Sequence, residues 1–329
     1  MYNKYLNCLT LNKYSDFSCS EACIALAASS FDCNFYMVFS NSLPFACNSS
    51  TDWNKNFNWK PKDDTYYLLK TINGVFIKRH RCKNINQLKY YIKRFTDSPI
   101  MLYTDDYYCS WTPYYLKTHG PHCILIVGIN DVNNTFYILD PVYSNKLLEM
   151  NFDNLKKVSK FCLLEISSHD TNPITTEHLL ILKQTIQSYY NLLIDKDYCT
   201  VLINLIEQFY KDAFVNIVLP DYHLQNLPLL RRFKGIAKDR KNYAIFLSGI
   251  ASDLNYSIDI TDLSNRCYEL SELWDSFRIN IIRCTLRNNY TKLISTSKQL
   301  MNNIITKECE LCDLLVRLFE LLEMNCSQK

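Results

Sequence analysis

The segment that most restricts how this chain can fold is 119–141, where two apolar runs flank a turn-rich Asn/Asp cluster at 130–134. Both runs are rich in β-branched and aromatic residues, which predicts a β-hairpin. Residues equidistant from a hairpin turn face one another, so a turn centred near Val132 brings His122 beside Asp140. A histidine held by a carboxylate can act as the base of a nucleophilic site. The structural alternative is that an aspartate before a proline simply ends the strand.

The nucleophile that such a site needs is best supplied by Cys19, which comes directly before a run of strong helix formers. Segment 20–29 is rich in alanine and predicts a helix that begins at Ser20. The unpaired N–H groups and the dipole at a helix start stabilise a thiolate and lower its pKa. Two other candidates remain: Cys23, one turn further in and expected to face the core, and Cys8, which has no helix to activate it. The alternative is that all three are buried packing thiols.

An aromatic segment leads from residue 105 into the presumed catalytic His122. Core packing alone explains so dense a row of aromatic side chains poorly, whereas aromatic loops beside a site exclude water and hold an extended substrate. We therefore predict substrate contacts from Tyr108, Trp111, Tyr115 and His119. An alanine-rich helix led by a cysteine, followed along the chain by histidine and aspartate, is also the order found in papain-like enzymes.

Composition excludes several classes of function. The 36 Lys and Arg against 33 Asp and Glu are interspersed, so neither nucleic acid nor an anionic membrane is an expected partner. None of the five glycines forms part of a phosphate loop or dinucleotide fingerprint, so no nucleotide cofactor is expected. Cys309 and Cys312 have metal-ligand spacing but no second pair or histidine nearby, so no metal is expected either.

The chain shows no signal peptide and no apolar run long enough to span a bilayer, which predicts a cytoplasmic protein. In that compartment the 15 cysteines are expected to be free thiols. Polar residues 166–176 contain a proline and predict a linker, which divides the chain into an α+β domain at 1–168 and an all-α domain at 169–329. Apolar residues recur at helical spacing in the second domain, around 179–186, 201–209, 243–250, 270–281 and 311–321.

Several motifs together resemble the N-terminal domain of the butirosin biosynthesis protein H family. They are Pro99, Asp105-Asp106-Tyr107-Tyr108, Trp111, Tyr114-Tyr115, His119-Gly120-Pro121-His122, Tyr137-Ile138-Leu139-Asp140-Pro141, the helix led by Cys19, and Phe39 with Ser42-Leu43-Pro44-Phe45. The likeness covers about residues 5 to 165 and is strongest from Pro99 to Pro141. The chain departs from the pattern in its extra cysteines near the helix and in lacking a Gln upstream of Cys19. Asn12 or the backbone N–H of Cys19 is then expected to supply the oxyanion hole.

The resemblance implies a papain-like fold related to bacteriocin-leader peptidases, in which the cysteine-led helix packs on an antiparallel sheet. It implies an acyltransferase of antibiotic biosynthesis that moves an acyl group from an acyl carrier protein, or from a peptidyl thioester, to an amine. Cys19, His122 and Asp140 would then be nucleophile, base and orienting group. The alternatives are a cysteine peptidase of the bacteriocin-leader type, a thioesterase, or a non-catalytic module that binds a peptide or a carrier protein.

Overall fold

A computed structural model of the chain describes residues 17–44, 66–94, 98–156, 161–194, 200–208, 210, 228–254 and 260–326. The chain divides into two compact units. The first contains the described parts of 17–38 and 66–172, and the second contains those of 39–44 and 173–326. An antiparallel sheet with helices in the first unit and helices in the second confirm the expected α+β class. Cys8 and Asn12, both named above, lie outside the described residues.

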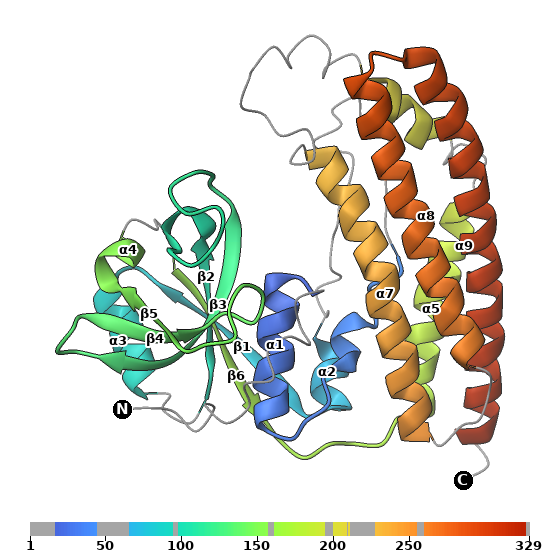
Figure 1. Cartoon of the computed structure of the whole chain (residues 1–329). Coiled ribbons are helices and arrows are strands. Elements are labelled where there is room, and N and C mark those ends of the chain that lie inside the picture. Colours follow the sequence, from blue (N-terminus) through green and yellow to red (C-terminus); the bar gives the residue numbers. More distant parts are fainter. Residues whose placement is uncertain are drawn as a thin grey trace. The chain divides into compact units, whose positions relative to one another are not determined.

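The first unit is built on one six-stranded sheet with the strand order β1-β6-β2-β3-β4-β5 (Figure 1). All its described pairings are antiparallel. The strands are β1 (Val75–Cys82), β2 (Ile100–Asp105), β3 (Pro121–Asn130), β4 (Thr135–Leu139), β5 (Leu148–Asn151) and β6 (Phe161–Ser168). The short helical elements of this unit are α1 (Cys19–Ser30), η3 (Tyr36–Phe39), α2 (Tyr67–Thr71), α3 (Ile85–Arg94), η4 (Asp106–Tyr108) and α4 (Phe152–Lys156). The central strand β3 carries His122 near its first residue.

Both faces of the sheet are covered, with α1 on one side and α3 and α4 on the other (Figure 1). Along β3, Ile124 and Ile126 join the hydrophobic core formed with α3 and α4. Leu125 and Val127 instead line the same small space as Leu26 of α1. This is the period-2 alternation of a strand buried on both faces. All seven consecutive residues of α1 from Ala22 to Ala28 are buried, and four of them are alanines. Their small side chains let α1 approach the sheet closely.

The predicted hairpin at β3 and β4 is present, and a β-bulge sets its register. Next to the turn, Asn130 pairs with Thr135, but the register shifts by one residue between Ile126 and Gly128. Beyond this bulge Leu125 pairs with Leu139. The next residue along the chain, Asp140, therefore lies opposite residue 124 and not opposite His122. The expected direct pairing of His122 with Asp140 is therefore wrong, because that pairing needs a turn centred at Asp131, whereas the pairing of Asn130 with Thr135 centres the turn between Val132 and Asn133.

The bulge nevertheless places the aspartate on the face that the histidine needs. Side chains alternate between the two faces of a strand, so a one-residue slip would move every side chain to the other face. With the bulge, the Asp140 side chain lies on the same face as those of residues 122 and 124, and Asp140 becomes a diagonal neighbour of His122. Long side chains can contact each other across this diagonal distance. Without it, Asp140 would follow opposite Leu125, on the face that packs against α1.

The second unit consists of helices in its described part: α5 (Thr176–Leu193), a helical segment at 200–208, α7 (Pro228–Leu254), α8 (Ile260–Leu286) and α9 (Tyr290–Cys326). Phe233 of α7 and Trp274 and Phe277 of α8 pack against one another in its core, with ring centroids 5.1 to 5.9 Å apart. Among the described helices, none is both long and apolar enough to cross a membrane.

A buried ion pair lies inside the second unit. Arg240 of α7 and Glu308 of α9 are both fully buried, and Nε of Arg240 donates to Oε1 of Glu308 at 2.7 Å. The guanidinium also donates to the carbonyl of Leu43 and to the hydroxyl of Tyr189, and the Trp274 indole donates to the same glutamate oxygen. Removing one member of a buried pair leaves an uncompensated charge, so the pair is a sensitive point in this unit.

We expect Glu308→Met to lower the free energy of unfolding by about 3–5 kcal/mol, because the guanidinium of Arg240 stays buried without its carboxylate. Urea denaturation measures the loss. Replacing both partners by Met should cost less than Glu308→Met alone, since no charge is then stranded. The matched control is Glu269→Gln, which breaks the exposed pair with Lys307 at 3.1 Å and should cost less than about 1 kcal/mol. Equal losses in the two single variants would contradict the expectation.

Candidate active site

The local sequence around Cys19 fixes the start of α1. Ser18 is the N-cap residue, its hydroxyl accepts from the backbone N–H of Glu21, and the Glu21 side chain accepts from the backbone N–H of Ser18 at 2.9 Å. This capping box sets the start of α1 at Cys19, one residue before the predicted start at Ser20. The first N–H groups of a helix have no intrahelical acceptor, so the thiol of Cys19 lies in an environment that favours negative charge.

The pKa of the Cys19 thiol is lowered to about 5. The largest cause is a hydrogen bond with the side chain of Cys123, and burial works in the opposite direction. His122 lowers the pKa further through a hydrogen bond and through its charge, and a hydrogen bond with the backbone N–H of Cys123 adds to this effect. Cys19 is therefore a thiolate at neutral pH, which is the reactive form of the side chain.

The competing thiol of Cys23 lies in a different environment. Cys23 is fully buried in α1, and burial raises its pKa well above the ordinary value, with further contributions from the charges of Cys19 and Asp140. A buried neutral thiol is a packing residue. Of the two described candidates, only Cys19 is thus electrostatically prepared to act as a nucleophile.

His122 contacts both Cys19 and Asp140, and the contact with Asp140 is the one that the hairpin predicts. Its Nε2 atom is 2.7 Å from Oδ2 of Asp140, and both side chains are almost completely buried. Since Asp140 occupies Nε2, the Nδ1 atom is the one that can exchange a proton with Cys19. Burial alone would lower the pKa of His122, but the hydrogen bonds with Asp140 and Cys19 and their charges raise it to about 10. The thiolate and imidazolium therefore stabilise each other as an ion pair at neutral pH.

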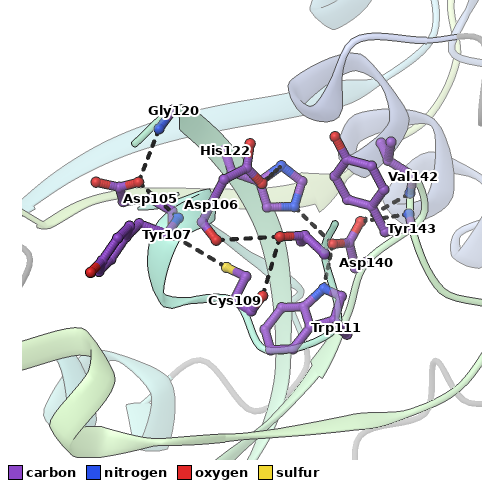
Figure 2. A network of polar contacts seen from close by, with 11 residues as sticks. Asp105, Asp106, Tyr107, Cys109, Trp111, Gly120, His122, Asp140, Val142 and Tyr143 are labelled. Carbon is purple, nitrogen blue, oxygen red and sulfur yellow. Dashed lines mark hydrogen bonds and ion pairs between the residues drawn. The ribbon is translucent and has the colours of Figure 1, made fainter. Parts of the chain in front are cut away.

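Four donors surround the carboxylate of Asp140 (Figure 2). Oδ2 accepts from the Trp111 indole at 2.6 Å as well as from His122, and Oδ1 accepts from the backbone N–H groups of Val142 and Tyr143. Burial would raise the pKa of Asp140, but these donors and the charge of His122 hold it below its usual range. The carboxylate is therefore ionised and fixed in orientation, and it holds the imidazole ring in place.

A second carboxyl group faces the other nitrogen of the histidine. Oδ1 of Asp106, the first residue of η4, is 3.7 Å from Nδ1 of His122. Figure 2 shows the His122 ring between the carboxyl groups of Asp106 and Asp140. In the sequence Asp106 is distinguished only as part of a family motif, and its position beside the site was not predicted.

The structure gives the four expected substrate-contacting residues different surroundings. Trp111 packs on the hydrophobic core and binds Asp140, so its contact with the site is through the carboxylate. Tyr108 packs against the same core, whereas Tyr115 is 36% exposed. His119 binds Asp105 at 2.8 Å and stacks on a neighbouring tyrosine ring. The substrate-binding role of these four residues stays a prediction.

Two further residues that contact the site were not anticipated from the sequence. Cys123 follows His122 directly and should point to the opposite face of the sheet, which is the face that packs on α1 and therefore reaches Cys19. Tyr143 follows Asp140 by three residues and places its ring centroid 5.3 Å from that of His122. Strand alternation together with a helix on that face could have indicated the first residue; no sequence signal indicates the second.

Comparison with protein-family models and with curated proteins gives no significant match to the chain.

Proposed function

We propose that the first unit is a cysteine-dependent acyltransferase that moves an acyl group from a carrier-protein thioester to an amine through a covalent acyl-enzyme. The observation that carries the proposal is the hydrogen-bonded series of Cys19, His122 and Asp140, in which a thiolate contacts an imidazolium that a buried carboxylate holds. This is the nucleophile, base and orienting group of covalent catalysis. The motif resemblance described above supports the choice of donor and acceptor.

In the first half-reaction, the Sγ atom of Cys19 attacks the carbonyl carbon of the donor thioester. The carbonyl oxygen becomes negative in the tetrahedral intermediate, and the N-terminal N–H groups of α1 are suited to stabilise it. As the intermediate collapses, the bond to the donor sulfur breaks, and His122 gives its Nδ1 proton to that sulfur. The products are a free carrier thiol, an acyl group on Cys19 and a neutral histidine.

In the second half-reaction, an amine attacks the acyl-enzyme and His122 accepts a proton from its nitrogen. The bond between Cys19 and the acyl carbon breaks, and the thiolate and imidazolium are restored. Aminolysis in preference to hydrolysis requires that water is excluded. Aromatic side chains around the histidine support this, since Tyr143 lies beside His122 and Tyr114 beside Tyr143.

The direct test uses an acyl thioester of N-acetylcysteamine, a small analogue of a carrier thioester, with and without an alkyl amine. We expect a mass adduct of one acyl group on Cys19 in the absence of the amine, and an amide product when the amine is added. Rapid release of the free acid that no amine diverts would favour a thioesterase or a peptidase. Absence of any adduct would favour the non-catalytic binding module.

The ion pair also predicts how alkylation depends on pH. At pH 6 we expect iodoacetamide to modify Cys19 on the order of 10-fold faster than Cys33 or Cys309, because its thiolate fraction outweighs the lower nucleophilicity of a low-pKa thiolate. Both comparison thiols are partly exposed, and burial raises the pKa of each. The rate at Cys19 should fall as the pH drops through about 5, where the thiolate is protonated.

Peptide mapping by mass spectrometry after short exposures gives these rates site by site. Equal rates at the three thiols at pH 6, or a Cys19 rate that begins to rise only in alkaline solution, would contradict an activated nucleophile.

A further inference from the structure

The carboxyl group of Asp106 is the strongest feature of the site that the proposed triad does not use. Asp106 is 9% exposed, and its Oδ1 atom is buried without a hydrogen-bond partner among the described residues. That atom is 3.7 Å from Nδ1 of His122, which is too long for a hydrogen bond. An orphaned buried carboxylate oxygen is costly, so its presence requires an explanation.

The backbone holds Asp106 in this position. Its N–H donates to the carbonyl of Gly120 at 2.9 Å, and its carbonyl accepts from the N–H of Cys109 and the hydroxyl of Thr112. Gly120 also leaves room for the carboxyl group, since a Cβ atom there would lie 3.3 Å from Oδ2 of Asp106. The side chain is thus fixed next to the histidine by the fold of the loop.

Asp105, the preceding residue, is a structural carboxylate of the same loop and provides a comparison for the hydrogen bonds of Asp106. Its Oδ1 accepts from the backbone N–H groups of Tyr107 and Gly120, and its Oδ2 binds His119. Every oxygen of Asp105 has a donor, whereas the buried oxygen of Asp106 faces the reacting nitrogen without one. Asp105 therefore stabilises the fold of this loop, whereas the carboxylate of Asp106 is directed at His122.

The chemistry of amide formation from an ammonium ion leaves one proton without an acceptor in the triad. An alkyl amine is protonated at neutral pH, so it must lose two protons to become an amide nitrogen. His122 is neutral after acylation and can take only one of them. When the amine binds as the ammonium ion, a second base within reach of the same nitrogen must take its first proton, and the amine must approach the side of His122 that carries Nδ1.

We propose that Asp106 is a catalytic residue of the second half-reaction, whose carboxylate binds the ammonium group of the acceptor and takes the first of its two protons. The freed lone pair then forms the C–N bond, His122 takes the second proton, and the bond to Cys19 breaks. Asp106 finally releases its proton to solvent. The inference rests on the proposed acyltransferase function and names its acceptor as a primary alkyl amine that arrives as a cation.

The electrostatics of the site agree with this role. Burial raises the pKa of Asp106 to about 6; the charge of His122 lowers it, and those of Cys19, Asp140 and Asp105 raise it. The carboxylate is therefore mostly ionised at pH 7, yet it can be protonated at small cost, as a general base requires. In the acyl-enzyme, where Cys19 is acylated and His122 is neutral, the carboxylates of Asp106 and Asp140 leave the site with a surplus of negative charge that attracts a cation.

The test compares two acceptors on the preformed acyl-enzyme: a primary alkyl amine, which is a cation at neutral pH, and methoxyamine, which is not. We expect Asp106→Asn to slow aminolysis by the alkyl amine on the order of 10²-fold more than aminolysis by methoxyamine. The wild-type rate with the alkyl amine should rise with pH as the carboxyl group of Asp106, whose pKa burial raises, becomes ionised, and the variant should lose this rise. With Asp106→Ala, added formate should restore part of the rate.

The matched control is Asp131→Asn, which removes the same charge from the far end of β3, where Asp131 pairs with Lys93 at 2.7 Å on the surface. It should change neither rate. Equal losses with both acceptors in Asp106→Asn, or a loss already in acylation, would overturn the inference and leave Asp106 as a positioning residue for His122. If the wild-type protein forms no acyl adduct, the proposed function itself fails, and that result precedes any measurement with amines.

Discussion

Replacing Cys19 by alanine is expected to abolish the acyl-enzyme, with no acyl adduct detectable by mass spectrometry after incubation with an acyl thioester. The reason is that no other described thiol combines the start of a helix with a hydrogen bond to His122. The fold should persist, because the side chain at the mouth of α1 is only partly buried and the capping box of Ser18 and Glu21 does not involve it. Far-UV circular dichroism and the unfolding midpoint check this.

Two further cysteine variants serve as controls for that result. Cys33→Ala removes a partly buried thiol of raised pKa from the same unit and should acylate like the wild type. Cys23→Ala removes a fully buried thiol of α1, so it should lower stability slightly and still form the adduct. An adduct that persists in Cys19→Ala would move the nucleophile to Cys23 or Cys8, and peptide mapping would show to which.

The main features of the first unit follow from local sequence signals. Helix formers after Cys19 and the alternation of β3 and β4 predict α1 and the hairpin, because period and capping are encoded within a few residues. The bulge between Ile126 and Gly128 could not be predicted in the same way, since it depends on which strand pairing the buried faces favour. The approximate position of Asp140 was thus predictable, and its diagonal register was not.

The site was predictable where it depends on chain order and unpredictable where it depends on tertiary contact. Cysteine, histidine and aspartate in this order, each at the end of an expected element, indicated the proposed triad. The indole of Trp111 was expected to cover a substrate, yet it donates to Asp140 from 29 residues away. Hydrogen-bond partners at such separations are set by the fold of a loop, which composition does not specify.

The second unit shows the same limit. Apolar residues at helical spacing predict its long helices, because each helix needs one buried face. Arg240 and Glu308 lie on such helices among many surface charges, so nothing in the sequence distinguishes them from solvated residues. Only the packing of α7 against its neighbours shows that both are fully buried and paired.

Asp140→Asn should reduce the acylation rate by about 10⁴-fold, the cost of the equivalent change in the serine-protease triad. In this protein all four contacts of the carboxylate are donors: His122, Trp111 and the backbone N–H groups of Val142 and Tyr143. An asparagine has only one acceptor oxygen, so its NH₂ group must face two donors in either orientation. If it faces His122, the ring loses its Nε2 proton and keeps one on Nδ1, where it cannot accept the proton of Cys19.

The same substitution has a second consequence that a purely structural role would not produce. Asp140 raises the pKa of His122, so its neutral replacement lowers the imidazolium population and thereby raises the pKa of the Cys19 thiol. The alkylation profile of Cys19 should then move upward from about pH 5. Trp111→Phe removes only one of the four donors and should give a smaller effect in the same assay. If Asp140→Asn acylates at a near-normal rate and its alkylation profile stays unchanged, Asp140 only ends the strand before Pro141, and His122 obtains its orientation elsewhere.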